Sequence, residues 1–172
     1  KSVFNIVGIS AEEYPVFPSY STQEFMKINA KVLSAMIEKT IFSVSTDETR
    51  YHLNGVYFEH YQNEGKAYYR MVATDGHRLS VIDKDALSTV SKHKVEGVII
   101  PRKGLFEIKK ILDVIDGEFE MAIEGSQLIA RHGSTTLMVR LIEGKYPNYQ
   151  QFIPKNLGKK VRLNKDQLVS SL

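Results

Sequence analysis

The segment PRKGLFEIKKIL, residues Pro101–Leu112, decides how the sequence around it is interpreted. Pro101 suits the first turn of a helix, because the backbone N–H that proline lacks would be unpaired there in any case. Four basic side chains and one acidic side chain predict a positively charged exposed side. Apolar side chains recur at helical spacing and predict a buried side: Leu105, Ile108, Ile111 and Leu112.

A second amphipathic helix is predicted within INAKVLSAMIEKTIF, residues 28–42. Asn29 is a suitable N-cap, because its side-chain oxygen can accept hydrogen bonds from the unpaired amides of the first turn. The apolar positions of this helix again follow one side: Val32, Leu33, Met36 and Ile37. The similar spacing in both helices suggests that one structural unit occurs twice.

Segments with strand character precede and follow both helices. Strands are expected at Ser2–Ile9, Tyr51–His60, Lys66–Ala73, Leu79–Ile82 and Val95–Ile100, and three more between residues 117 and 144. The order of strand, helix and strands therefore occurs twice. We predict an α+β domain of two βαβββ-type halves, with two helices on one face of antiparallel sheets.

Length and composition limit the class of protein. The chain has 172 residues, the size of one domain, and its 42% hydrophobic and 25% charged residues are typical of a folded protein. It has no cysteine, which excludes a disulfide scaffold, a cysteine–zinc site and a thiol nucleophile. No apolar run approaches the roughly 20 residues of a membrane span, and no signal peptide is visible. We therefore expect a cytoplasmic protein without a membrane partner.

The two ends of the sequence suggest a piece of a longer protein. The chain begins at Lys1 rather than at Met, and it ends with LNKDQLVSSL, which is typical of a helix that starts after an Asn164 cap. A helix that stops there has nothing to pack on. We expect the intact polypeptide to continue.

Positive charge is concentrated in one place. The chain has a formal net charge of +3, and PRKGLFEIKKIL alone carries four basic residues and one acidic residue. Arg102 and Lys109 are seven residues apart, as are Lys103 and Lys110, so each pair lies on nearly the same side of the helix. Such a stripe suits contact with a nucleic-acid backbone without base recognition. An ordinary solvated helix surface is the alternative.

The segment VATDGHRLSV, residues 72–81, contains the residue types of a catalytic site. Thr74 as nucleophile and His77 as base, with Asp75 between them, would indicate a hydrolase. Triad side chains converge in space, however, whereas successive residues of a turn point apart. Asp-Gly favours a tight turn in which Asp75 bonds its own backbone two residues on. We favour the turn, and we predict no metal or cofactor because no ligand spacing or phosphate loop is present.

Four blocks occur in the same order and at similar spacing in one protein family: RYHLNGVYFE (50–59), ATDGHRLSV (73–81), IIPRKGLFEI (99–108) and EGKYPNYQQFIPKN (143–156). Through these blocks the chain resembles the bacterial sliding clamps, the beta subunits of DNA polymerase III. The resemblance implies a DNA-clamp fold. It also implies three parts: residues 1–21 as the end of the first clamp domain and a linker, residues 22–156 as the middle domain, and residues 157–172 as the start of a truncated third domain.

The function that the resemblance implies is topological. Two three-domain subunits form a ring that encircles duplex DNA without sequence specificity, and the ring tethers the replicative polymerase for processive synthesis. The implied partners are duplex DNA, the DNA polymerase III catalytic subunit, the clamp loader and other proteins with a clamp-binding motif. The protein is then a non-catalytic processivity subunit, classed with DNA-directed DNA polymerases and nucleotidyltransferases only by association. The present chain alone is expected to be monomeric, because ring closure needs both outer domains.

The same resemblance implies two sets of site residues. The DNA-binding set adds Arg50, Tyr51, His52 and Arg78 to the basic stripe of the helix. The second set forms half of a groove for a short, partly hydrophobic partner peptide: Leu53, Thr74, Gly76, His77, Arg78, Leu79, Pro147 and Phe152. Its apolar members would supply a pocket, and Gly76 would let the peptide backbone approach closely. A peptide-binding module without ring closure is the alternative to the clamp, together with the hydrolase.

Overall fold

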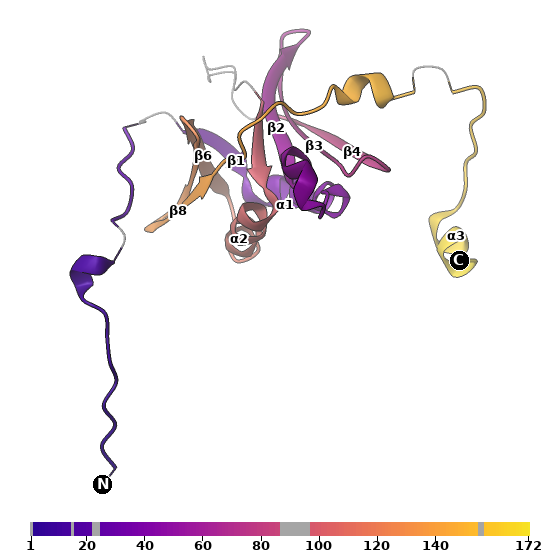
Figure 1. Ribbon diagram of the computed structural model, residues 1–172. Coiled ribbons are helices and arrows are strands. Elements are labelled where there is room, and N and C mark those ends of the chain that lie inside the picture. The colour runs from indigo at the N-terminus through magenta and orange to yellow at the C-terminus, as the bar shows by residue number, and fades with distance from the viewer. Residues whose placement is uncertain (1, 15, 22–24, 87–96, 155–156) are drawn as a thin grey trace.

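The computed structural model describes residues 2–14, 16–21, 25–86, 97–154 and 157–172. Two four-stranded antiparallel sheets and two helices make up the body, and both ends of the chain reach away from it (Figure 1). The N-terminal arm contains η1 (Ala11–Glu13), and the C-terminal segment contains α3 (Lys165–Ser170). Within the described residues, no helix has the length and apolar composition to cross a membrane.

The body repeats one order of elements, as predicted. The first half consists of β1 (Met26–Asn29), α1 (Ala30–Glu38), β2 (Gly55–Asn63), β3 (Lys66–Thr74) and β4 (Leu79–Asp85). The second half consists of β5 (Val98–Pro101), α2 (Arg102–Leu112), β6 (Glu118–Glu124), β7 (Gln127–His132) and β8 (Thr135–Arg140). Three short 3-10 helices complete the body: η2 (Ile41–Ser43), η3 (Glu48–Leu53) and η4 (Tyr149–Phe152). The prediction of two βαβββ-type halves is confirmed.

The two halves exchange their first strands. The sheets have the strand orders β1-β6-β7-β8 and β4-β3-β2-β5, so each first strand pairs with the other half. Ile28 lies opposite Phe119 at one junction, and Val56 lies opposite Ile100 at the other; all four side chains are buried. Because a buried strand must pair its backbone groups, neither half can complete its sheet alone.

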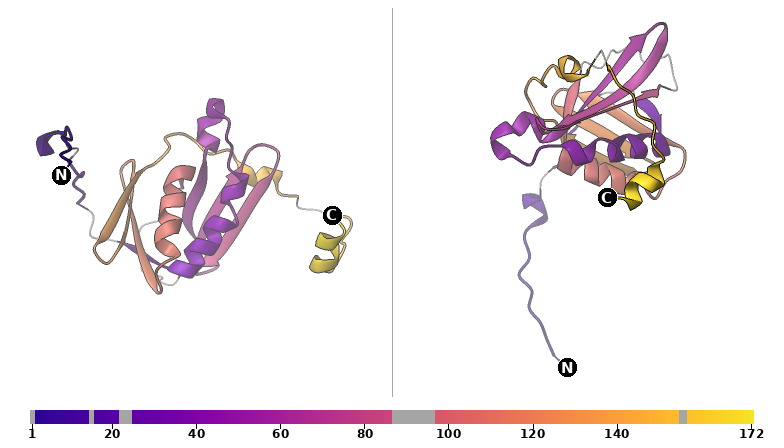
Figure 2. Two further views of the ribbon diagram at one scale, coloured as in Figure 1. Left: turned by 90° about the horizontal axis from the view of Figure 1, so that it is seen from below. Right: turned by 90° about the vertical axis from the view of Figure 1, so that its right-hand side faces the viewer.

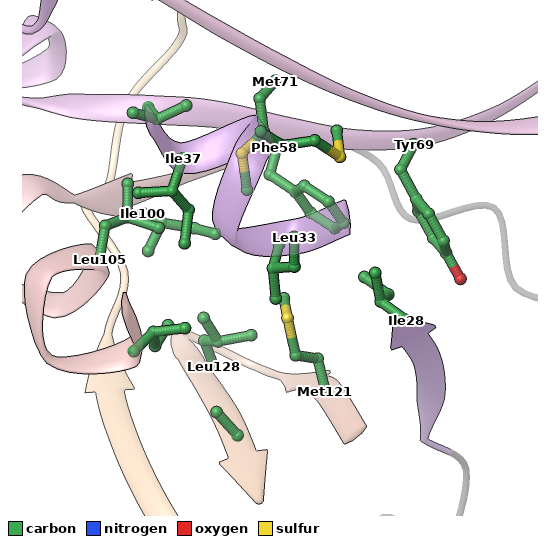
Figure 3. Packing of buried hydrophobic residues seen from close by; sticks show 14 of the residues in the cluster. Ile28, Leu33, Ile37, Phe58, Tyr69, Met71, Ile100, Leu105, Met121 and Leu128 are labelled. Carbon is green, nitrogen blue, oxygen red and sulfur yellow. The ribbon is translucent and has the colours of Figure 1, made fainter. Parts of the chain in front are cut away.

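Helices α1 and α2 lie side by side on the same face of the sheets (Figure 2). Asn29 caps α1, and its side-chain oxygen accepts from the amides of Lys31 and Val32 at 3.0 and 3.3 Å. Both apolar stripes pack in one core, with Val32 and Ile111 only partly buried. Each fully buried large side chain contributes about 1.5–3 kcal/mol. Figure 3 shows this core: Leu33, Ile37, Phe58, Met71, Ile100, Leu105, Met121 and Leu128.

The structure does not form the strand that was predicted at Ser2–Ile9. The apolar side chains there are open to solvent, with Val7 98% exposed, and the segment has no strand conformation. A strand forms only where another edge pairs with its backbone, and here β1 supplies the first strand instead. The first three residues of the strand predicted at Tyr51–His60 belong to η3 rather than to a strand. The first two residues of the strand predicted at Val95–Ile100 lie outside the described residues.

Gly104 of α2 faces Val139 of β8, with no room for a side chain between them. A Cβ added at Gly104 would lie 2.4 Å from Cγ1 of Val139, and a β-branched side chain has little freedom to turn away. We expect Gly104→Ala to lower the free energy of unfolding by about 1–3 kcal/mol, although alanine is the better helix former. Urea unfolding at neutral pH measures this difference.

The double variant Gly104→Ala/Val139→Ala provides the control. Truncating Val139 makes room for the new methyl group, so the double variant should lose less stability than the two single variants together. Strict additivity would mean that this contact does not limit the packing of α2.

Candidate partner pocket and basic helix face

A pocket of about 320 Å³ opens beside the turn between β3 and β4. The end of η3, the β3–β4 turn and the chain after β8 contribute to it. Its lining residues are Leu53, Thr74, Gly76, His77, Arg78, Leu79, Pro147, Tyr149 and Phe152. All eight residues that the resemblance assigned to a peptide groove therefore meet in one place, and Tyr149 is an addition.

The β3–β4 turn is held by its own side chains. The Asp75 carboxylate accepts from the backbone amides of His77 and Arg78 at 2.9 and 3.0 Å, as the turn interpretation predicted. The Thr74 hydroxyl accepts from the Gly76 amide at 3.1 Å and donates to the Arg78 carbonyl at 2.6 Å. Gly76 has φ +90°, a conformation that favours glycine. The turn thus presents one defined backbone shape to the pocket.

These bonds do not assemble the hydrolase site. The Thr74 hydroxyl donates its hydrogen bond to the Arg78 backbone carbonyl rather than to an imidazole. Among the described residues, no hydrogen bond joins the exposed His77 ring to Thr74 or Asp75. A nucleophile needs its base within hydrogen-bond reach. The part of the chain that the structure describes also contains no cluster of His, Asp or Glu able to hold a metal ion.

The floor of the pocket is apolar and joins a small core. Leu53 is 5% exposed and belongs to a buried cluster with Val72, Ile99 and Tyr146. Phe152, by contrast, is 65% exposed at the rim. A buried aliphatic floor with an exposed aromatic rim suits the apolar side chain of a partner.

Tyr149 is the pocket residue that the sequence reasoning missed. It is one of several aromatic residues between Glu143 and Pro154, and spacing does not distinguish it from the others. In the structure it is 6% exposed, and its hydroxyl donates to Glu59 at 2.9 Å and accepts from Arg70 at 3.1 Å. Burial raises the pKa of Tyr149, so the hydroxyl keeps its proton at neutral pH.

Four residues of the predicted DNA-binding set lie on η3 and on the β3–β4 turn. Arg50 Nη1 donates to the Asp75 carbonyl at 3.0 Å, which ties η3 to the turn. Tyr51 is 57% exposed and stands edge to face with His52, with ring centres 5.7 Å apart. The Arg78 side chain is exposed and pairs with Asp75 at 3.1 Å. Arg78 thus lines the pocket, and Arg50 is tied to the turn that forms part of it.

Lys109, a member of the predicted stripe, lies between the two helices. Its side chain is only 22% exposed, and Nζ lies 2.7 Å from Asp113 and 2.9 Å from Glu38 of α1. The bonds to Asp113 and Glu38 raise the pKa of Lys109. Lys109 therefore connects α1 to α2, and much of its charge is balanced within the protein.

The other three basic residues of α2 are exposed. Lys110 is paired with Glu107 at 2.9 Å, yet 71% of its side chain is accessible, and such surface pairs are weak. The Arg102 guanidinium lies 5.3 Å from the centre of the Phe106 ring. Among the described residues, no ion pair involves Arg102 or Lys103. The first turn of α2 thus offers the most available positive charge on this helix.

The profile of the DNA polymerase III beta subunit, central domain, matches residues 27–148. The chain belongs to this family, and the predicted DNA-clamp fold is confirmed. Its curated relatives are beta sliding clamps. It is 31% identical over 166 residues to that of Caulobacter vibrioides NA1000 (96% of the chain, 44% of the relative). It is 36% identical over 163 residues to that of Staphylococcus epidermidis RP62A (95% and 41%).

Solved sliding clamps have the same fold. The chain superposes on a Caulobacter crescentus clamp with a TM-score of 0.79 at 30% identity, covering 86% of the chain and 39% of that clamp. For a Bartonella birtlesii clamp bound to griselimycin, the TM-score is 0.76 at 35% identity, with 84% and 38% covered. The chain therefore spans less than half the length of these relatives.

Asp75 makes the turn sensitive to acid. Hydrogen bonds from the His77 and Arg78 amides, followed by the Arg78 charge, lower the pKa of Asp75 from 3.8 to about 2. A lowered pKa in the folded state means that ionised Asp75 contributes stability above the unfolded value, and that this contribution is lost as the pH falls towards the folded value. The stability advantage of the wild type over Asp75→Asn should therefore be full above about pH 5 and shrink between about pH 4 and pH 2.

Urea unfolding of both proteins between about pH 2 and pH 6 measures this dependence. Other carboxylates titrate in the same range, but they do so in both proteins and cancel in the difference. A stability difference that does not change with pH would contradict the turn's dependence on ionised Asp75.

Proposed function

We propose that this chain is the central part of a sliding clamp, which in the intact protein closes head to tail as a ring around duplex DNA. The observation that carries the proposal is the meeting of eight groove residues, from three separate segments, at one pocket. Family membership supports it. A clamp acts by raising the effective concentration of the polymerase at the primer end, so the protein is a processivity factor and not an enzyme.

The proposed domain organisation follows from the same reasoning. Residues 22–156 form the middle clamp domain, which agrees with the profile match at residues 27–148. Residues 1–21 end the first domain, residues 157–172 begin the third, and the protein acts in the cytoplasm. Since ring closure needs both outer domains, the 172-residue chain alone should be monomeric.

The pocket is proposed to dock short peptides of the polymerase, the clamp loader and other clamp users. Leu53, Leu79 and Pro147 line the pocket with apolar surface that can bind the hydrophobic end of a peptide. Thr74 and Arg78 lie at the rim, where polar contacts select the rest of the peptide. The turn backbone is held by its own hydrogen bonds, so little ordering is needed when a peptide binds.

A peptide titration tests the pocket. The probe is Gln-Leu-Ser-Leu-Phe, and amide chemical shifts of the chain are the readout. We expect chemical-shift changes confined to residues 76–79 and 147–152. Leu79→Ala should weaken peptide binding by about tenfold or more, because it removes an apolar side chain from the pocket lining.

Val114→Ala is the matched control for that variant. It also truncates an aliphatic side chain, but Val114 is 82% exposed on the connection between α2 and β6. It should bind like the wild type. If the wild type shows no shifts at millimolar peptide, or shifts equally far from the pocket, the docking role is refuted.

DNA contact is proposed to be loose and directed at phosphates. A sliding ring needs exposed cations that do not read bases, and the exposed basic side chains of α2 meet this need. We infer that Arg102 and Lys103 carry more of the contact than Lys109, because Glu38 and Asp113 already neutralise Lys109. Arg50, Tyr51, His52 and Arg78 would add contacts beside the pocket.

The salt dependence of DNA binding distinguishes the contribution of Arg102 and Lys103 from that of Lys109. Each phosphate contact contributes about −0.9 to the slope of log K against log salt. Arg102→Gln/Lys103→Gln should therefore make the slope less steep by about 1.8, whereas Lys109→Gln should leave the slope nearly unchanged and lower the melting temperature. Fluorescence anisotropy with a labelled duplex at several salt concentrations measures both slopes. Equal effects on the slope would contradict the distinction.

A further inference from the structure

Arg70 is the centre of a polar cluster on the sheet that contains β2, β3 and β4. Its Nε and Nη2 donate to the two carboxylate oxygens of Asp83 on β4 at 2.6 and 2.8 Å. Nη2 also donates to the Tyr61 hydroxyl on β2 at 2.8 Å, and the guanidinium lies 4.5 Å from the centre of the Tyr61 ring. Arg70 is therefore held by two neighbouring strands, and its side chain is only 19% exposed.

The remaining donor of Arg70 points out of the sheet towards η4. Nη1 donates to the Tyr149 hydroxyl at 3.1 Å, and this hydroxyl donates in turn to Glu59 Oε1 on β2 at 2.9 Å. Glu59 also lies 3.6 Å from Arg70 Nη1. The hydroxyl of Tyr149 is thus bound from two sides by charged groups, and bonds of this kind are stronger than bonds between neutral groups.

The Tyr149 side chain is the main attachment of η4, because its ring packs against Tyr57 in the small core and its hydroxyl binds Arg70 and Glu59. Within η4, whose four residues are all described, Tyr149 alone is buried. The backbone bonds of this segment are local, from the Tyr149 amide to Pro147 at 2.8 Å and from the Ile153 amide to Gln150 at 3.4 Å. Phe152, at the other end of η4, is mostly exposed at the pocket rim. The orientation of this wall therefore depends on the Tyr149 side chain.

We propose that Arg70 and Glu59 are positioning residues for the partner pocket, which fix its η4 wall through the Tyr149 hydroxyl. Neither residue lines the pocket, so neither would touch a bound peptide. They act by ordering Pro147 and Phe152 before the peptide arrives, which removes part of the entropy cost of binding. The inference rests on the proposed docking function of the pocket.

Two single-atom deletions test the proposal. Tyr149→Phe and Tyr61→Phe each remove one hydroxyl that accepts from Arg70, at 3.1 and 2.8 Å. Only Tyr149 belongs to the pocket. Titration of the 172-residue chain with Gln-Leu-Ser-Leu-Phe should show about threefold to tenfold weaker binding for Tyr149→Phe. Tyr61→Phe should bind like the wild type, even if both variants lose similar stability in urea.

Amide hydrogen exchange without peptide gives an independent readout. The Ile153 amide, which closes η4, should exchange faster in Tyr149→Phe than in the wild type and remain unchanged in Tyr61→Phe. Arg70→Met should reproduce the faster exchange, because it removes the donor to the Tyr149 hydroxyl. Unchanged exchange in Tyr149→Phe, or equal exchange in the two tyrosine variants, would overturn the positioning role.

The outcomes separate this inference from the docking function. If the wild type binds the peptide and Tyr149→Phe binds it equally well, the pocket is a docking site but its wall does not depend on the cluster, and the inference is wrong. If the wild type does not bind, the docking function fails, and the assignment of Arg70 and Glu59 to it fails as well. Faster exchange in Tyr149→Phe would then show only that the cluster orders η4.

Discussion

The exchange of first strands between the two halves is the constraint on which the rest of the structure depends. Strands β1 and β5 lead directly into α1 and α2, and each strand pairs with the sheet of the other half. Pairing β1 with β6 and β5 with β2 therefore places both helices over the junction of the sheets (Figure 2). Their apolar sides close one core, and their polar sides form one surface. Lys109 joins the helices across this surface through Glu38 and Asp113.

The pocket is a second consequence of the way the sheets meet. After β8 the chain crosses to the other sheet, where the Ile142 amide donates to the Ile99 carbonyl of β5 at 2.9 Å. Tyr146 then stacks on Tyr57 of β2, with ring centres 5.1 Å apart. The crossing carries the following residues to the β3–β4 turn. A site of three distant segments thus depends on this backbone contact and this aromatic contact, together with the bonds of the Tyr149 hydroxyl to Arg70 and Glu59.

Local interactions explain which features the sequence predicted well. The buried side of α2 follows from the helical period of its apolar residues, and the Asp75 turn follows from a carboxylate that bonds amides two and three residues on. The groove residues were found through resemblance to a family, because no spacing indicates that Leu53 and Phe152 meet. Lys109 and Lys103 look equivalent in the sequence, yet Lys109 is covered because Glu38 lies beside it. The stretch at residues 2–9 alternates like a strand but has no strand conformation here.

The sequence by itself determined the buried sides of both helices, the Asn29 cap, the shape of the β3–β4 turn and the order of the elements after the first strand. Each of these features depends on residues close together in the sequence, within about one or two helical turns. At that range, hydrophobic periodicity and side-chain hydrogen bonds determine the local structure directly. The tertiary structure alone decided the exchange of strands, the exposure of each lysine and the partners of Tyr149. These features depend on contacts between residues far apart in the chain, because pairing and burial are set only when the two sheets and the helices pack together.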